Sequence, residues 1–87
     1  MYASDSSRVV FRVVKAMVSD VIDLFGTDVT FSQETDTHVT VTARVNELAM
    51  RQFAKSYAPN VLILEPQRLA DAVRRDAKRT IEAYQQI

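Results

Sequence analysis

The strongest constraint on the fold of this chain is a stretch of eight residues, 38–45, in which polar and apolar side chains alternate without exception. Successive side chains of a β-strand point to opposite faces of a sheet, so strict alternation predicts a strand with one buried face. The set expected to face the core is Val39, Val41, Ala43 and Val45, and the set expected to face away is His38, Thr40, Thr42 and Arg44.

Three further segments are predicted to be strands. Residues 8–14 are rich in β-branched side chains, and we expect the apolar set Val9, Phe11 and Val13 to point into the core. The alternate set, expected on the opposite face, is Val10, Arg12 and Val14. The two shorter segments are 28–32, with Val29 and Phe31 facing inward, and 61–64.

Apolar residues spaced by three and four positions predict three amphipathic helices between and after these strands. Gly26 is expected to end the first helix, Asn46 to cap the second, and Pro66 to lie near the start of the third. Their apolar stripes are, in order, Met17, Val18, Val21, Ile22 and Phe25; Met50, Phe53, Ala54 and Tyr57; and Leu69, Val73, Ala77, Ile81 and Tyr84.

The predicted order is β-α-β-β-α-β followed by one more helix, which defines an α+β, ferredoxin-like fold with a four-stranded antiparallel sheet. Right-handed crossovers place both crossover helices on one side of the sheet and make the strands at 8–14 and 38–45 central. The other side, which we call the open face, then needs a cover. Three covers are possible: the last helix, a second copy of the chain or a neighbouring domain. The last strand contributes either Val61 and Ile63 or Leu62 and Leu64 to the open face.

Length and composition indicate one domain. A chain of 87 residues rarely divides, so we expect residues 8–87 to form a single domain and the polar segment 1–7 to be a disordered lead. No apolar run approaches the roughly 20 residues that span a bilayer, so no membrane contact is expected. The absence of Cys favours a cytoplasmic protein.

The residue inventory argues against catalysis. There is one His and no Cys, and the Ser residues lie outside any nucleophile motif, so we expect no enzyme, no cofactor and no metal site. Glu34, Asp36 and His38 are better explained as a solvated hairpin loop than as metal ligands. The aromatic side chains on which RNA-recognition modules of this topology stack bases are missing from residues 38–45.

Charge is balanced overall but unevenly distributed. Residues 1–50 carry four basic and seven acidic side chains, whereas residues 51–87 carry seven basic and four acidic ones. Such a dipolar pattern favours association with another surface over catalysis. On the open face, Arg12 and Arg44 are candidate anion contacts, although solvated strand arginines or interface ion pairs are the favoured explanation. On the last helix the candidate anion contacts are Arg74, Arg75, Lys78 and Arg79, where a solvated helix face is the favoured explanation.

Four segments in this order resemble a known module, the C-terminal extension, called WCX, of bacterial WYL-domain transcriptional regulators. They are V-V-F-R-V at 9–13, D-L-F-G at 23–26, V-T-V-T-A-R-V at 39–45 and V-L-I-L-E-P-Q-R-L at 61–69. The resemblance covers about residues 8–84. Such modules commonly carry Gly where this chain has Ala58, and the helix-turn-helix and WYL domains of these regulators lie outside it, so the chain is expected to be a piece of a longer protein.

The resemblance implies a non-catalytic role in transcription regulation: homodimerisation, or packing against a ligand-sensing WYL domain, with relay of a nucleotide or single-stranded nucleic-acid effector. DNA would be bound by the helix-turn-helix domain. An alternative is a stand-alone small-molecule sensor that binds its effector at a dimer interface. The residues expected to form the partner or ligand surface are Val10, Arg12, Val14, Thr40, Thr42 and Arg44.

Overall fold

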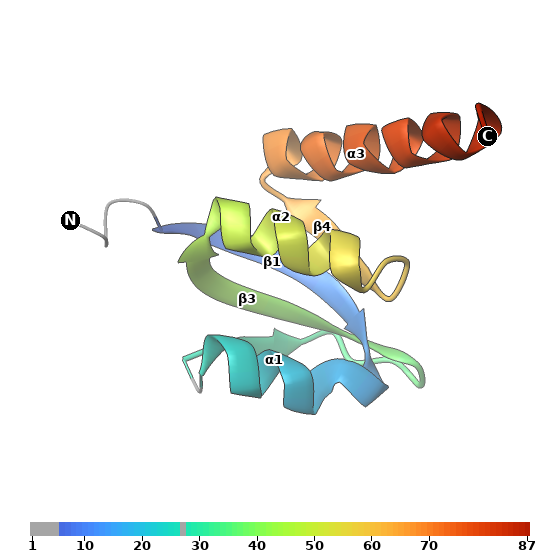
Figure 1. Cartoon of the computed structure of the whole chain (residues 1–87). Helices are drawn as coiled ribbons and strands as arrows, with labels where there is room; N and C mark the ends of the chain where they lie inside the picture. The colour runs from blue at the N-terminus through green and yellow to red at the C-terminus, as the bar shows by residue number, and fades with distance from the viewer. Residues whose placement is uncertain (1–5, 27) are drawn as a thin grey trace.

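The computed structural model describes residues 6–26 and 28–87. These residues form four strands, one short 3-10 helix and three α-helices, and the strands and α-helices follow the order expected from the hydrophobic periodicity (Figure 1). The elements are β1 (Ser6–Val14), η2 (Lys15–Met17), α1 (Val18–Phe25), β2 (Thr30–Ser32), β3 (His38–Asn46), α2 (Glu47–Ser56), β4 (Val61–Glu65) and α3 (Gln67–Gln85).

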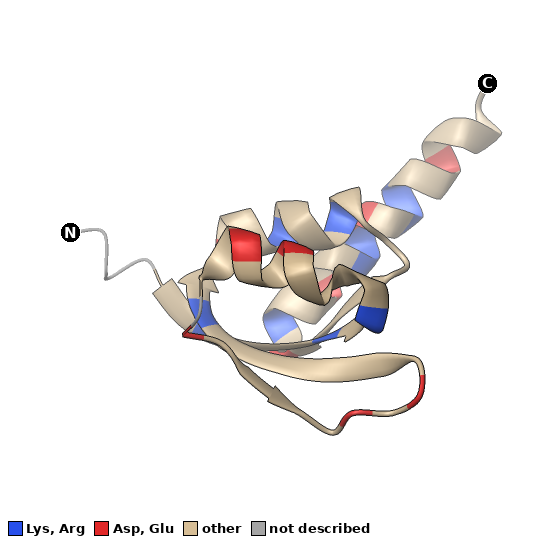
Figure 2. Cartoon of the chain, turned by 90° about the horizontal axis from the view of Figure 1, so that it is seen from below, with Lys and Arg blue, Asp and Glu red and all other residues tan. Residues whose placement is uncertain are grey.

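The four strands make one antiparallel sheet in the order β2-β3-β1-β4. The two central strands are therefore β1 and β3, which pair along nine residues from Ser6 opposite Asn46 to Val14 opposite His38. Helices α1 and α2 lie on the same side of the sheet, as Figure 2 shows. The predicted α+β, ferredoxin-like fold with an extra C-terminal helix is confirmed.

The core lies between the sheet and these two helices, and it is built from the residue sets that the alternation assigned to it. Phe11 and Val41, which are opposite each other on β1 and β3, are fully buried. Val21 of α1 and Met50 of α2 are fully buried above them. Removing such side chains from water supplies the main driving force for folding, at roughly 1.5–3 kcal/mol for each fully buried large residue.

Local signals at the helix ends act as expected. The Asn46 side chain accepts a hydrogen bond from the backbone N–H of Ala49 at 3.0 Å, which caps α2. Gly26 ends α1 with φ at +81°, a backbone conformation that L-residues with a Cβ rarely adopt. Its N–H donates to the carbonyl of Ile22 at 2.8 Å.

The N-terminal segment predicted to be disordered is longer than the structure allows. We expected residues 1–7 to be disordered, but β1 begins at Ser6, and Ser6 and Ser7 lie opposite Asn46 and Val45 of β3. The strand extends because β3 is long enough to offer partners to both serines. Residues 1–5 lie outside the described part of the chain.

The second strand is shorter than predicted. It spans three residues, and Phe31, although opposite the core residue Val41, is 39% exposed. β2 is an edge strand, so its side chains have neighbours on one flank only. Phe31 therefore points to the core side, as predicted, but keeps part of its ring in solvent, whereas Val29 is half-buried against the core.

The last helix packs through its first half only. Leu69, Ala72 and Asp76 are buried, and every residue from Ala77 onward is exposed. α3 packs against α2 and β4 at one end of the sheet and then projects past them, with its red C-terminal turns clear of the other elements (Figure 1). It does not lie across the open face, so the first of the three predicted covers is excluded.

Two Phe-to-Ala variants test which side of the sheet carries the core. Phe11→Ala should lower the free energy of unfolding by about 3–5 kcal/mol, because a fully buried aromatic leaves a cavity. Phe31→Ala is the matched control and should cost roughly 1 kcal/mol, since Phe31 is already 39% exposed. Urea denaturation measures both, and equal losses would contradict the assigned core.

Candidate functional site

The open face is the side of the sheet that neither crossover helix covers (Figure 2). Directly opposed residues of an antiparallel pair point to the same side. Arg12 lies opposite Thr40, Val10 opposite Thr42 and Arg8 opposite Arg44. All six residues that the sequence assigned to a partner surface therefore share this face: Val10, Arg12, Val14, Thr40, Thr42 and Arg44.

These six residues differ in accessibility. Arg12 and Arg44 are exposed, Val14 and Thr42 are half-buried, and Val10 and Thr40 are 8% and 5% exposed. Val10 and Thr40 are short side chains on the two central strands, each with a paired strand on both flanks, so little of their surface reaches solvent. A partner on the open face would contact the other four and not these two.

The edge strand β4 adds aliphatic surface to this face. Leu62 lies opposite Arg12 and is 47% exposed, whereas Val61 lies opposite the core residue Val13 and is buried. This settles the alternative left open by the sequence in favour of Leu62. A register shift between Val10 and Phe11 places Leu64, 36% exposed, at an irregularity near the strand end.

The charge of the open face is positive. Arg8 donates to Glu65 at 3.3 Å, and both side chains are largely solvent-exposed. Within the described part of the chain, Arg12 and Arg44 form no ion pair. The face therefore combines exposed leucines with two cationic side chains that are available to an anionic group.

The four candidate anion contacts lie on the exposed side of α3. Residues four apart are neighbours on a helix, so Arg74 lies beside Lys78 and Arg75 beside Arg79, in two adjacent rows. Arg74 Nη1 lies 3.8 Å from Asp71 Oδ1, and the positive charge of Arg79 acts on Asp76. Two of the four cations therefore already interact with acids of the same helix.

An ion pair joins α3 to α2, and sequence reasoning missed it. Arg51 donates from Nε to Asp76 Oδ2 at 2.7 Å and from Nη2 to Oδ1 at 2.8 Å, a bidentate arrangement. Lys55 Nζ lies 3.8 Å from the same carboxylate. The hydrogen bond from Arg51 is the main cause that lowers the pKa of Asp76 from 3.8 to about 2, against the opposing effect of burial. The available signal was Asp76 itself, a lone acid inside a basic run.

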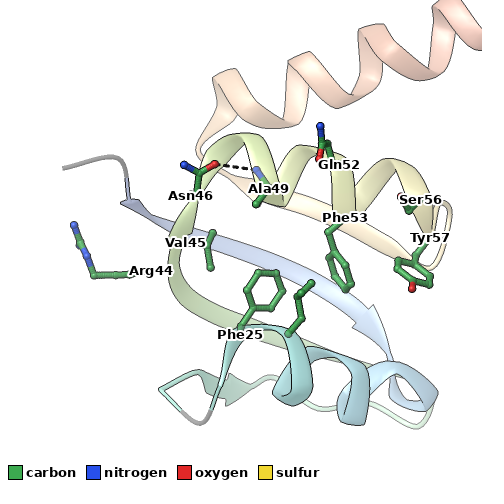
Figure 3. A pocket seen from close by; sticks show the side chains of 10 residues that line it. Phe25, Arg44, Val45, Asn46, Ala49, Gln52, Phe53, Ser56 and Tyr57 are labelled. Carbon is green, nitrogen blue, oxygen red and sulfur yellow. Dashed lines mark hydrogen bonds between the residues drawn. The ribbon is translucent and has the colours of Figure 1, made fainter. Parts of the chain in front are cut away.

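A groove of about 560 Å³ lies between α1 and α2 (Figure 3). Phe25 of α1 and Phe53 of α2 meet there edge to face, with ring centroids 5.3 Å apart, and Tyr57 packs on Phe53 at 5.2 Å. Gln52 and Ser56 add polar groups to the lining. Arg44 lines the mouth, but its side chain points away from the aromatic rings (Figure 3).

The hairpin that contains His38 is organised by its own hydrogen bonds. The His38 N–H donates to Thr35 Oγ1 at 3.0 Å, and His38 Nδ1 lies 2.7 Å from Thr37 Oγ1. Glu34 pairs with Lys15 at 2.7 Å, which lowers the pKa of Glu34. Across residues 6–26 and 28–87, no group of three or more His, Asp or Glu side chains is placed to hold a metal ion.

The fold and these surfaces define a class: a small α+β, ferredoxin-like module whose sheet has one uncovered, cationic and partly aliphatic face. The sequence model of the WCX domain family matches residues 5–81. The chain therefore belongs to the WCX domain family, as its four ordered segments indicated. A search of curated proteins found no match. The WCX domain is a regulatory type of domain. No helix of the described residues has the length and apolarity needed to cross a membrane.

The Arg51–Asp76 pair predicts a specific dependence of stability on pH. The pKa of Asp76 is about 2 in the folded chain against 3.8 ordinarily. Ionised Asp76 therefore stabilises the folded state above pH 3.8, and this contribution is lost as the pH falls from 3.8 through about 2. Between about pH 5 and pH 2, the melting temperature of the wild type should fall further than that of Asp76→Asn.

Glu34→Gln is the matched control for this experiment. Its partner also lowers the pKa of Glu34, but the pair is exposed and screened by water, so its removal should leave the pH profile close to that of the wild type. Parallel profiles for the wild type and Asp76→Asn would contradict the assigned role of Asp76.

Proposed function

We propose that this chain is a non-catalytic, C-terminal interaction module of a cytoplasmic, DNA-binding transcriptional regulator. Its open face packs against the ligand-sensing WYL domain of that regulator, and it relays the binding of a nucleotide or single-stranded nucleic-acid effector or supports dimerisation. The helix-turn-helix domain of the parent protein binds the DNA. Membership of the WCX domain family is the observation that carries this proposal.

The composition of the open face supports such a role. Leu62 lies opposite the exposed cation Arg12, and Leu64 adds further exposed aliphatic surface on the same strand. Arg44 contributes a second exposed cation on β3. Contiguous exposed apolar surface with a polar rim is typical of protein interfaces, and Arg is enriched there. Guanidinium groups bind carboxylates and phosphates in bidentate geometry, so both a partner domain and an anionic effector suit this face.

Charge reversal on the open face tests the proposal. Arg12→Glu should weaken the binding of the chain to the WYL domain of its parent protein at least about tenfold, because a carboxylate would replace an exposed guanidinium in the contact. Val14→Asp should act in the same direction by placing a charge on the apolar part of the face. Isothermal titration calorimetry measures both affinities, and circular dichroism checks that each variant folds.

Arg75→Glu is the matched control, because it reverses the same charge on α3, away from the open face. It should leave the affinity within about twofold of the wild type. Unchanged binding in Arg12→Glu together with a loss in Arg75→Glu would move the contact to α3 and contradict the proposal.

The groove between α1 and α2 favours a second function, a small-molecule sensor. Three aromatic rings, Phe25, Phe53 and Tyr57, offer stacking surface, and Gln52 and Ser56 offer hydrogen bonds. Clefts of several hundred Å³ lined by aromatic side chains with a few polar groups are typical ligand sites. This location differs from the dimer interface at which the sequence placed a sensor site.

A thermal-shift screen separates the two functions. Amino acids, nucleotides and short oligonucleotides are added singly, and a saturable rise in melting temperature with one metabolite supports the sensor. The Tyr57→Ala variant should abolish that rise, since Tyr57 lines the groove and is 46% exposed, whereas Tyr84→Ala, on the projecting half of α3, should preserve it. A shift that survives Tyr57→Ala would place the ligand elsewhere.

A further inference from the structure

Three arginines form a row along one side of α3. Arg75 and Arg79 lie seven and eleven residues after Arg68, close to whole turns of a helix with about 3.6 residues per turn, so all three point in nearly the same direction. All three are exposed. The row runs beside the buried side of α3, which includes Leu69 and Ala72, and therefore borders α2.

Two cations of α2 face this row. Arg51 and Lys55 are about one turn apart on α2, and both reach Asp76 of α3. Arg51 donates to the Asp76 carboxylate at 2.7 and 2.8 Å, and Lys55 Nζ lies 3.8 Å from it. The positive charge of Arg79 acts on the same carboxylate. The α2–α3 seam is the surface formed by these cations of both helices, which are Arg51, Lys55, Arg68, Arg75 and Arg79.

Positive charge is in excess on the α2–α3 seam. Asp76 pairs with Arg51, and Glu47 of α2 pairs with Arg68. Five cations and these two acids leave a net charge of +3. Arg75 forms no ion pair with any other residue that the structure describes. The seam therefore retains cationic groups for an acidic group of another molecule.

A hollow of about 390 Å³ opens on the seam. Leu48 of α2 stands at this hollow and is 63% exposed, so apolar surface is left uncovered beside the cations. Exposed apolar surface with a polar rim is typical of protein interfaces. The hollow therefore suits an apolar side chain that has acidic neighbours. Its lining residues are Glu47, Leu48, Arg51, Arg68, Leu69, Ala72 and Arg75.

We propose that the α2–α3 seam binds an acidic, amphipathic helix of another protein. An apolar side chain of that helix enters the hollow beside Leu48, and two carboxylates one turn apart pair with Arg75 and Arg79. The spacings match, because residues four apart on any α-helix are separated by about 6 Å along its axis. Docking of an amphipathic helix through its apolar side chains is a common mode of recognition.

The residues of the seam favour a polypeptide over a nucleic acid. Proteins that bind single strands combine cations with aromatic side chains on which the bases stack. Among the described residues that form the seam or line its hollow, none is aromatic. Asp76 and Glu47 would also repel a phosphate backbone, and Leu48 would gain nothing from it. An acidic helix with one apolar side uses both the cations and Leu48.

The seam is separate from the open face. Helix α2 lies on the side of the sheet opposite to the open face (Figure 2), so a helix bound along α2 and α3 does not occupy the surface that contains Arg12 and Arg44. The inference therefore goes beyond the proposed function and does not depend on it. Arg12→Glu should leave binding at the seam unchanged, which keeps the failure of one proposal distinct from the failure of the other.

Isothermal titration calorimetry of the full chain tests the inference. The probe is a synthetic helical peptide of about 14 residues, made of Glu and Ala with a central Leu. It should bind with a dissociation constant of about 100 μM or tighter at low salt, and added salt should weaken the binding. The double variant Arg75→Gln with Arg79→Gln should raise the dissociation constant at least about tenfold.

The matched control removes the same charge from the neighbouring row of the same helix. Arg74→Gln with Lys78→Gln changes two cations that are also four residues apart, and it should leave the dissociation constant within about twofold of the wild type. Leu48→Gln tests the hollow and should weaken binding at least about threefold, because a polar side chain replaces the apolar contact. Circular dichroism checks that each variant folds.

Four results would overturn the inference. The first is no binding of the peptide at about 1 mM. The second is an equal loss in both pairs of cation variants, which would mean that only net charge matters. The third is unchanged binding in Leu48→Gln. The fourth is tighter binding of an oligothymidylate of about 12 nucleotides with the same dependence on Arg75 and Arg79, which would assign the seam to nucleic acid.

Discussion

The mutual packing of three phenylalanine rings, in tilted and edge-to-face pairs, is the contact on which the rest of the structure depends. Phe11 of β1, Phe25 of α1 and Phe53 of α2 lie with ring centroids 5.3–6.3 Å apart. Because one ring comes from the sheet and one from each crossover helix, the cluster holds both helices on the same side. Aromatic pairs of this geometry are worth about 0.5–1.5 kcal/mol beyond their buried area. The same contact leaves the opposite side of the sheet without a cover.

The hydrophobic pattern correctly predicted which face of each central strand points into the core. Strict alternation in residues 38–45 and a partial period-two pattern in residues 8–14 placed Val41 and Phe11 in the core, because a strand offers only two faces. The pattern failed where burial depends on neighbours that it does not describe. Phe31 lies on the core side but at an edge, Thr40 lies on the open side yet is buried, and Ile81 continues a helical stripe beyond the end of its support. The periodicity of a strand or helix predicts which of its sides faces the core. How much of that side is buried depends on how far the neighbouring element extends over it.

The candidate surfaces were predictable to different degrees for the same reason. The shared face of Arg12 and Arg44 follows from antiparallel pairing of two alternating strands, so the sequence was sufficient. The Arg51–Asp76 contact joins residues 25 positions apart on two helices, and no local pattern reports their distance. Its carboxylate is held with a bidentate partner at the point where α3 leaves α2. This ion pair adds to the buried contacts of Leu69 and Ala72, which a helical apolar pattern can predict, a contact that such a pattern does not predict.

The balance of charge over the whole chain hides an uneven distribution over its elements. α1 carries Asp20 and Asp23 and no basic side chain, whereas α3 carries five basic and three acidic side chains, and Figure 2 shows both colours along that helix. A surface that meets its own copy has to be neutral or self-complementary, whereas a surface that meets a different partner gains from a net charge, which steers encounter and rejects copies of itself. The open face, with the exposed cations Arg12 and Arg44, fits the second requirement.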